Sequence, residues 1–211
     1  MSMRPLYLSF TPTNTSTTRF GTGLTAASGA ALPITQTAVQ DALAHKIIIT
    51  PTGAVTGNYV LTGTDADGQT QTETLATDAA NAVTSAKYYK TLTSVLAPSG
   101  LGAETVSIGF TSAFASKTIP LEIYLQGQTV NCQVNVTGTA NFDIEDTMDD
   151  IRASYSPGPS QEDYVWLNDA NFTNKSASLS APLAVVARAI RFAVNSYTNG
   201  VVIELDVITP K

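Results

Sequence analysis

Apolar and polar residues alternate in short runs along most of the chain, and glycine, proline, asparagine or aspartate interrupts these runs about every ten residues. The first run covers residues 6–10, and residues 47–49 are three consecutive isoleucines. Such runs favour β-strands, because branched side chains pack well on a pleated surface. Only residues 34–44 resemble a short helix, since their apolar residues fall on one face at helical spacing. The pattern predicts an all-β fold with little helix.

Three pairs of strand-like runs flank turns that contain glycine. Asn-Gly and Asp-Gly supply the positive φ angles that tight hairpin turns require. Each pair is therefore predicted to form a β-hairpin: residues 59–64 with 69–75 around Asp67 and Gly68, residues 121–125 with 130–136 around residues 126–128, and residues 187–195 with 201–208 around Asn199 and Gly200.

Threonine content and predicted strand length both change near residue 118. Threonine is frequent before this point, whereas the later strands are longer and contain less threonine. We therefore expect two β modules, residues 1–118 and residues 119–211, without a flexible linker between them. Each is predicted to be a β-sandwich or jelly-roll-like unit, because several short strands with regular turn signals are typical of these folds.

The amino-acid composition indicates a surface with few charged residues. Charged residues make up 13% of the 211 residues, while the average is about 25%. The chain has 31 threonines and 17 serines. We therefore expect hydroxyl groups to replace charged groups over much of the solvent-exposed surface. The net charge is −6 and the isoelectric point is about 4.6. This charge disfavours a strongly basic nucleic-acid-binding protein, since phosphate neutralisation needs clustered lysine and arginine.

The acidic charge is concentrated in residues 141–169, where eight acidic residues face one basic residue for a net charge of −7. Four interpretations remain open: a solvated surface, a docking surface for a basic partner, a divalent-cation site and a carboxylate pair of a glycoside hydrolase. The alternation of residues 141–146 predicts that Phe142 and Ile144 point inward and that Asp143 and Glu145 point outward on an exposed face. The candidate partner or glycan contacts in this segment are Asp143, Glu145, Asp146, Asp149, Asp150 and Trp166.

Asp65 and Asp67, next to Gly68, are weak candidates for metal ligands. Carboxylates at alternate positions before a glycine resemble the start of a calcium-binding loop. The complete loop needs a third acidic position before its glycine and a glutamate six residues after it. Here Gly68 follows Asp67 directly, and the nearest glutamate is Glu73. A tight hairpin turn is therefore the favoured interpretation, and we expect neither a metal nor another cofactor.

The chain offers few residues for catalysis. Cys132 is the single cysteine and lies in an alternating run, which favours a packed side chain. His45 is the single histidine, so neither a zinc site nor a serine triad is expected. No phosphate-binding loop or nucleophile elbow is present in the sequence. We therefore expect a protein that is not an enzyme.

Trp166 is the single tryptophan and follows Tyr164 within the acidic segment. Aromatic rings beside carboxylates are typical of carbohydrate-binding surfaces, because a ring stacks on the sugar while carboxylates bind its hydroxyls. Packing in the interior is the more common role of a single tryptophan in a β protein. Both interpretations remain open.

The N-terminal residues lack the apolar segment of a signal peptide, and no apolar run reaches the length of a membrane span. We therefore expect a soluble protein made in the cytoplasm, without a membrane partner.

Several segments resemble a pattern found in structural proteins of tailed bacteriophages. Two of its elements are the hydroxyl-rich hairpin at residues 63–75 and the run from Val83 to Val95. Together with the remaining elements, which extend to the C-terminal part of the chain, the similarity covers about two thirds of the chain. The remaining elements are residues 42–45, residues 104–109, Trp166, Ala181 with Pro182, residues 189–197 and Gly200.

The resemblance implies a non-enzymatic virion protein that decorates or cements the capsid shell as a symmetric dimer or trimer. Its partners would be the major capsid protein or another virion protein, with no nucleic acid among them. A neck, tail or fibre component is the alternative within this class, and a carbohydrate-binding module is the alternative outside it. The charge distribution suggests that the N-terminal module anchors the protein and the acidic C-terminal module projects.

Overall fold

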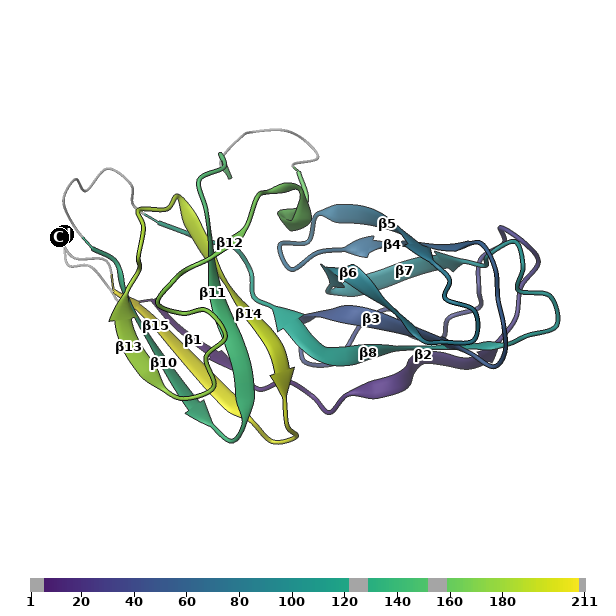
Figure 1. The fold of residues 1–211 in the computed structure, drawn as a ribbon, viewed down its shortest axis with the longest axis horizontal. Coiled ribbons are helices and arrows are strands. Elements are labelled where there is room, and N and C mark those ends of the chain that lie inside the picture. Colours follow the sequence, from purple (N-terminus) through teal and green to yellow (C-terminus); the bar gives the residue numbers. More distant parts are fainter. Residues whose placement is uncertain (1–5, 122–128, 152–158, 209–211) are drawn as a thin grey trace.

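The computed structural model describes residues 6–121, 129–151 and 159–208, which form fifteen strands and one short 3-10 helix, η1 (Gln161–Asp163). The strands belong to three antiparallel sheets, and Figure 1 shows them in two lobes. The predicted all-β, sandwich-like fold with little helix is confirmed. No helix in the described part of the chain has the length and apolar content needed to cross a membrane.

The first lobe is a sandwich formed by one end of the largest sheet and a three-stranded sheet. Its core contains side chains from both sheets, among them Ile47 and Phe110 from one and Tyr59 and Leu92 from the other. The strands of the larger sheet are β2 (Ser16–Leu24), β3 (Ala44–Pro51), β6 (Val83–Tyr89) and β8 (Val106–Ala115), and those of the smaller sheet are β4 (Asn58–Thr64), β5 (Thr70–Ala76) and β7 (Thr91–Leu96).

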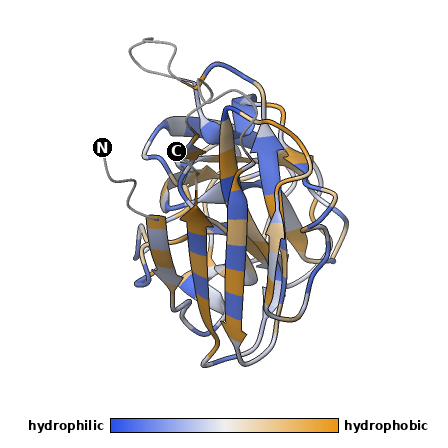
Figure 2. Cartoon of the chain, turned by 90° about the vertical axis from the view of Figure 1, so that its left-hand side faces the viewer, coloured by the Kyte–Doolittle hydropathy of each residue, from blue (hydrophilic) through white to orange (hydrophobic). Residues whose placement is uncertain are grey.

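The second lobe is also a sandwich. Its four-stranded sheet has the order β1-β15-β10-β13, and it packs against β11 and β14 of the largest sheet through a core that includes Val134, Phe142, Phe192 and Leu205. Hydrophobic and hydrophilic residues alternate along strands of the four-stranded sheet (Figure 2). The strands of this lobe are β1 (Leu6–Phe10), β9 (Ile119–Pro120), β10 (Asn131–Thr137), β11 (Ala140–Thr147), β12 (Leu167–Asn168), β13 (Leu179–Pro182), β14 (Ala189–Tyr197) and β15 (Val202–Ile208).

The two lobes share the largest sheet. The end of β8 pairs with β14, with Phe114 opposite Val194 and Ala115 opposite Ala193. Phe114 also enters the core of the second lobe, where its ring lies 5.9 Å from that of Phe10. β1 lies within the range of the predicted N-terminal module but pairs with β15 in the second lobe. The division at residue 118 stays a prediction.

The predicted hairpin around Asp67 and Gly68 is confirmed. β4 and β5 pair along their whole length, from Asn58 opposite Ala76 to Thr64 opposite Thr70. Gly68 has a φ of +86°, a left-handed conformation that is favourable for glycine. The hairpin predicted for residues 121–136 falls largely outside the described residues.

The hairpin predicted around Asn199 and Gly200 is wrong. β14 lies in the largest sheet and β15 in the four-stranded sheet, so the turn connects the two layers of the sandwich. β10 and β11 are joined in the same way, and the Thr198 amide donates to the Thr139 carbonyl between the two turns. Asn-Gly favours the turn conformation, but the partners of each strand decide whether the strands pair.

The short helix predicted for residues 34–44 is also wrong. Ala42 has a φ of +62°, which is incompatible with a right-handed helix. The segment uses its backbone to contact strands: Thr35 donates to the Phe20 carbonyl, and the Leu92 amide donates to the Thr37 carbonyl. These strand contacts outweigh the weak helical pattern.

Candidate functional site

The acidic segment contains carboxylates that bind neighbouring parts of the chain. Asp143 is only 6% exposed and accepts hydrogen bonds from the Asn174 amide and from Asn195 Nδ2. The predicted inward positions of Phe142 and Ile144 are confirmed, and Asp143 and Glu145 lie on the opposite face of β11. The prediction that this face is exposed is wrong, because other parts of the chain cover both carboxylates. The segment that returns from β12 lies alongside β11 and covers this carboxylate.

Other carboxylates of the segment organise loops. Asp169 is buried and accepts hydrogen bonds from the amides of Asn171 and Ala184. Asp146 is buried, and its pKa is raised by burial and by the nearby charge of Asp169. Asp149 accepts a 2.6 Å hydrogen bond from the Val165 amide. These bonds favour a structural role for much of the acidic segment.

Arg191 lies at the centre of a polar cluster between the lobes and is only 4% exposed. Its Nε donates to Glu145 at 2.5 Å, and its Nη1 donates to Glu162 at 2.7 Å and to Gln161 at 3.3 Å. Burial raises the pKa of Glu162, whereas Arg191 opposes this shift. The arrangement neutralises a buried guanidinium with two carboxylates. It is a structural ion cluster, and the sequence does not predict it because Arg191 is 46 residues from Glu145 and 29 residues from Glu162.

Aromatic rings flank this guanidinium. Its central carbon lies 4.7 Å from the Trp166 ring centroid and 5.5 Å from that of Tyr88, within the range of cation–π contacts. Trp166 also donates from Nε1 to the Gln161 carbonyl at 2.7 Å, and its ring contacts that of Tyr164 edge-on. Trp166 therefore helps to hold the Arg191 cluster together, and one face of its ring is occupied by the protein's own cation.

Asp65 and Asp67 connect the β4–β5 turn to the second lobe. Asp65 accepts hydrogen bonds from the Asp67 and Gln69 amides through one oxygen and from the Gln161 amide through the other. Asp67 accepts hydrogen bonds from the Thr118 amide and hydroxyl. The carboxylates thus bind donors where a calcium site would need free oxygens. In the described ranges, no group of three or more histidine, cysteine, aspartate or glutamate residues could hold a metal ion.

His45 and Cys132 are both buried. His45 Nε2 lies 2.9 Å from Asp41, which also accepts hydrogen bonds from the Thr13 and Leu43 amides. Burial raises the pKa of the Cys132 thiol to about 12, so the thiol is protonated at neutral pH. The expectation that Cys132 is a packed side chain is confirmed.

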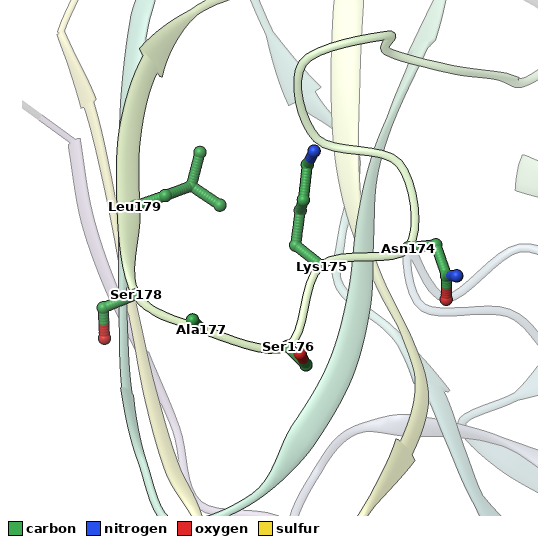
Figure 3. A pocket seen from close by; sticks show the side chains of 6 residues that line it. All are labelled: Asn174, Lys175, Ser176, Ala177, Ser178 and Leu179. Carbon is green, nitrogen blue, oxygen red and sulfur yellow. The ribbon is translucent and has the colours of Figure 1, made fainter.

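A hollow of about 340 Å³ lies beside β13, lined by one stretch of chain from Asn174 to Leu179. Figure 3 shows the side chains of Lys175 and Leu179 reaching into this space from the loop and the strand. Most of its lining residues are exposed, and none is a buried charged side chain. We assign no ligand to it.

The second lobe presents a concentration of exposed apolar side chains. Its two interlayer turns, after Thr137 and after Tyr197, lie at one end of the sandwich, so the start of β1, the end of β11 and the end of β15 lie at the other. We call this second end the apolar end. The large apolar side chains exposed in the described part of the chain all belong to it: Leu6, Tyr7, Met148, Val165, Leu167, Val185, Val186 and Ile208.

Pairing and hydrogen bonds place these residues together. Met148 follows the last residue of β11, and Leu167 lies opposite Asp146 near the end of that strand. The Arg188 amide donates to the Thr147 carbonyl, which places the loop containing Val185 and Val186 beside the same strand end. The sequence did not reveal this surface, because its residues come from five separate segments.

No protein-family model matches this chain, and no curated protein matches it significantly.

Proposed function

We propose that the protein is a non-enzymatic structural component of a tailed-bacteriophage particle, binding the capsid shell through the apolar end. The observation that supports this function is the concentration of exposed large apolar side chains at one end of one lobe. Exposed apolar residues in such a group are typical of an interaction surface. The resemblance of the hydroxyl-rich segments to phage structural proteins supplies the class of partner, the major capsid protein or another virion protein.

The position of the apolar end favours a particular orientation on the particle. The charge distribution suggests that the N-terminal module anchors the protein, but the exposed large apolar residues of the described chain lie in the second lobe. In our proposal the second lobe contacts the particle, and the threonine-rich first lobe projects into solvent. Asp149 and the exposed Asp150–Arg188 ion pair lie near the contact surface and would form part of its polar rim.

The experiment is co-sedimentation of the full chain with phage particles assembled without it. Val165 and Val186 are 64% and 71% exposed, so Val165→Lys/Val186→Lys leaves the core intact while placing two charges on the contact surface. We expect binding to fall about tenfold or more, equivalent to about 1.4 kcal/mol or more. The matched control is Thr72→Lys/Thr74→Lys on β5 of the first lobe, where both threonines are exposed.

Equal binding by the two double variants would contradict the role of the apolar end. Failure of the unmodified chain to sediment with any particle would contradict the virion function itself. Binding to tails but not to heads would replace capsid decoration with a neck, tail or fibre role. A glycan-array signal that is lost in Trp166→Phe would instead support a carbohydrate-binding module.

A further inference from the structure

β1 forms an open edge of the four-stranded sheet. It pairs with β15 on one side, and no described strand pairs with it on the other (Figure 2). Its five residues contain neither a charge nor a proline, and Leu6 and Tyr7 are 40% and 53% exposed. Proteins usually protect such edges with charges, prolines, bulges or covering segments, because an open edge pairs readily with another strand.

The edges of the first lobe are protected in these ways. Glu73 of β5 accepts hydrogen bonds from the Ala86 and Lys87 amides and so occupies the edge of β6. The segment before β3 covers β7, where the Leu92 amide donates to Thr37. The same segment covers β2, where the Thr35 amide donates to Phe20.

The remaining edges of the second lobe are short or blocked. β9 and β12 have two residues each. β13 has four residues and ends in Pro182, whose carbonyl accepts a hydrogen bond from Asn171 Nδ2. Within the described ranges, β1 is therefore the longest edge without a charge, a proline or a covering segment.

We propose that β1 pairs antiparallel with β1 of a second copy across a twofold axis, which joins two four-stranded sheets into one of eight strands. Full overlap of the two strands places Leu8 opposite Leu8 and Tyr7 opposite Ser9. Leu8 is half-buried at the margin of the core, and the partner strand would cover it. This inference rests on the proposed assembly function and specifies one partner, the same protein.

Charge on β1 does not oppose a second copy at this edge. Two chains with a net charge of −6 repel each other where their carboxylates meet, but β1 itself carries no charge, and Glu204 and Asp206 lie one strand further from the partner on β15. The contact is also self-complementary, as a twofold interface requires. Exposed Leu6, Tyr7 and Ile208 add apolar area beside the paired backbones, which leaves Met148, Val165, Leu167, Val185 and Val186 of the apolar end for the particle.

The first test places like charges opposite each other. In Tyr7→Lys/Ser9→Lys, each lysine would face a lysine of the partner strand, an arrangement that destabilises strand pairs. We expect a dimer of the unmodified chain in analytical ultracentrifugation and a dissociation constant at least about tenfold higher in the variant. Ser180→Lys is the control, since Ser180 is an exposed serine on the opposite edge of the same sheet. Thermal unfolding checks that all variants fold.

The second test examines the register. Directly opposed residues lie within reach of a disulfide, so Tyr7→Cys/Ser9→Cys should form a covalent dimer under mild oxidation. Either single cysteine variant should cross-link much less, because its partner position is two residues away. Buried Cys132 does not compete for the bond.

The outcomes separate this inference from the proposed function. A monomeric unmodified chain that still sediments with particles would overturn the β1 dimer and leave the virion role in place. A dimer that persists in Tyr7→Lys/Ser9→Lys would show that another surface associates, and would also overturn the inference. A β1-dependent dimer that binds no particle would support the dimer and contradict the virion role.

Discussion

Arg191 shows how one residue can organise contacts between distant parts of a β protein. It lies on β14 among apolar neighbours, and its partners come from β11 and from η1. A buried guanidinium is stable only when carboxylates and hydrogen bonds replace water. The ion pairs with Glu145 and Glu162 meet this requirement.

We expect Arg191→Met to lower the free energy of unfolding by about 3–5 kcal/mol, because it leaves two carboxylates close together and without their cation. Denaturant unfolding measures the loss. Arg188→Met is the control, since its ion pair with Asp150 is exposed and should contribute about 1 kcal/mol or less. Equal losses in the two variants would contradict the role of the buried cluster.

Cys132 gives a second prediction at the residue level. Because burial raises the pKa of its thiol to about 12, the reactive thiolate is scarce in the folded protein at pH 8. We expect negligible reaction with a thiol reagent until denaturant unfolds the chain, after which one thiol per chain reacts. Rapid labelling of the folded protein would show that the interior around β10 opens readily.

Among the structural elements, the β4–β5 turn has a role beyond reversing the chain. Asp65 is 1% exposed and binds the Gln161 amide of the second lobe, so the turn connects two segments that are 96 residues apart. Burial raises the pKa of Asp65, while hydrogen bonds from the Gln161 and Gln69 amides lower it.

We expect Asp65→Ala to lower the free energy of unfolding by about 1–3 kcal/mol, since it leaves a buried amide without an acceptor. Asp78→Ala, at an exposed position, is the control and should have an effect within about 0.5 kcal/mol. Calcium should not raise the melting temperature of the unmodified protein. A calcium-dependent rise that is lost in Asp65→Ala would restore the metal-site interpretation.

The interlayer turns show where sequence reasoning about elements fails. Asn199 and Gly200 predict a turn, and Gly200 has the expected positive φ of +81°. Whether the flanking strands pair depends on β1, β8, β10 and β11, which compete for them. The β4–β5 hairpin was predictable because its two strands pair with each other along their full length.

For the whole molecule, the shared sheet is the main structural feature. β8 contributes to the core of the first lobe through Phe110 and to that of the second through Phe114. The contacts of Asp65, Asp67 and Arg191 lie across the same junction. The lobes should therefore depend on each other for stability.

We expect the protein to unfold in one cooperative transition, because neither lobe keeps its sheet complete without the other. Scanning calorimetry should give equal calorimetric and van't Hoff enthalpies, the criterion for two-state unfolding. Arg191→Met combined with Asp65→Ala weakens the junction and should broaden or split the transition. Two separate transitions in the unmodified protein would instead support independent modules.

The sequence alone determined the β class and several strands, because alternating apolar residues and turn residues act over a few neighbouring positions. It also determined that Phe142, Ile144 and Cys132 lie inside. Only the tertiary structure decided that Asp143 is buried, that Asp65 connects the lobes and that eight exposed apolar residues gather at one end. These features depend on contacts between segments far apart in the chain, and local patterns carry no information about which distant strands become neighbours.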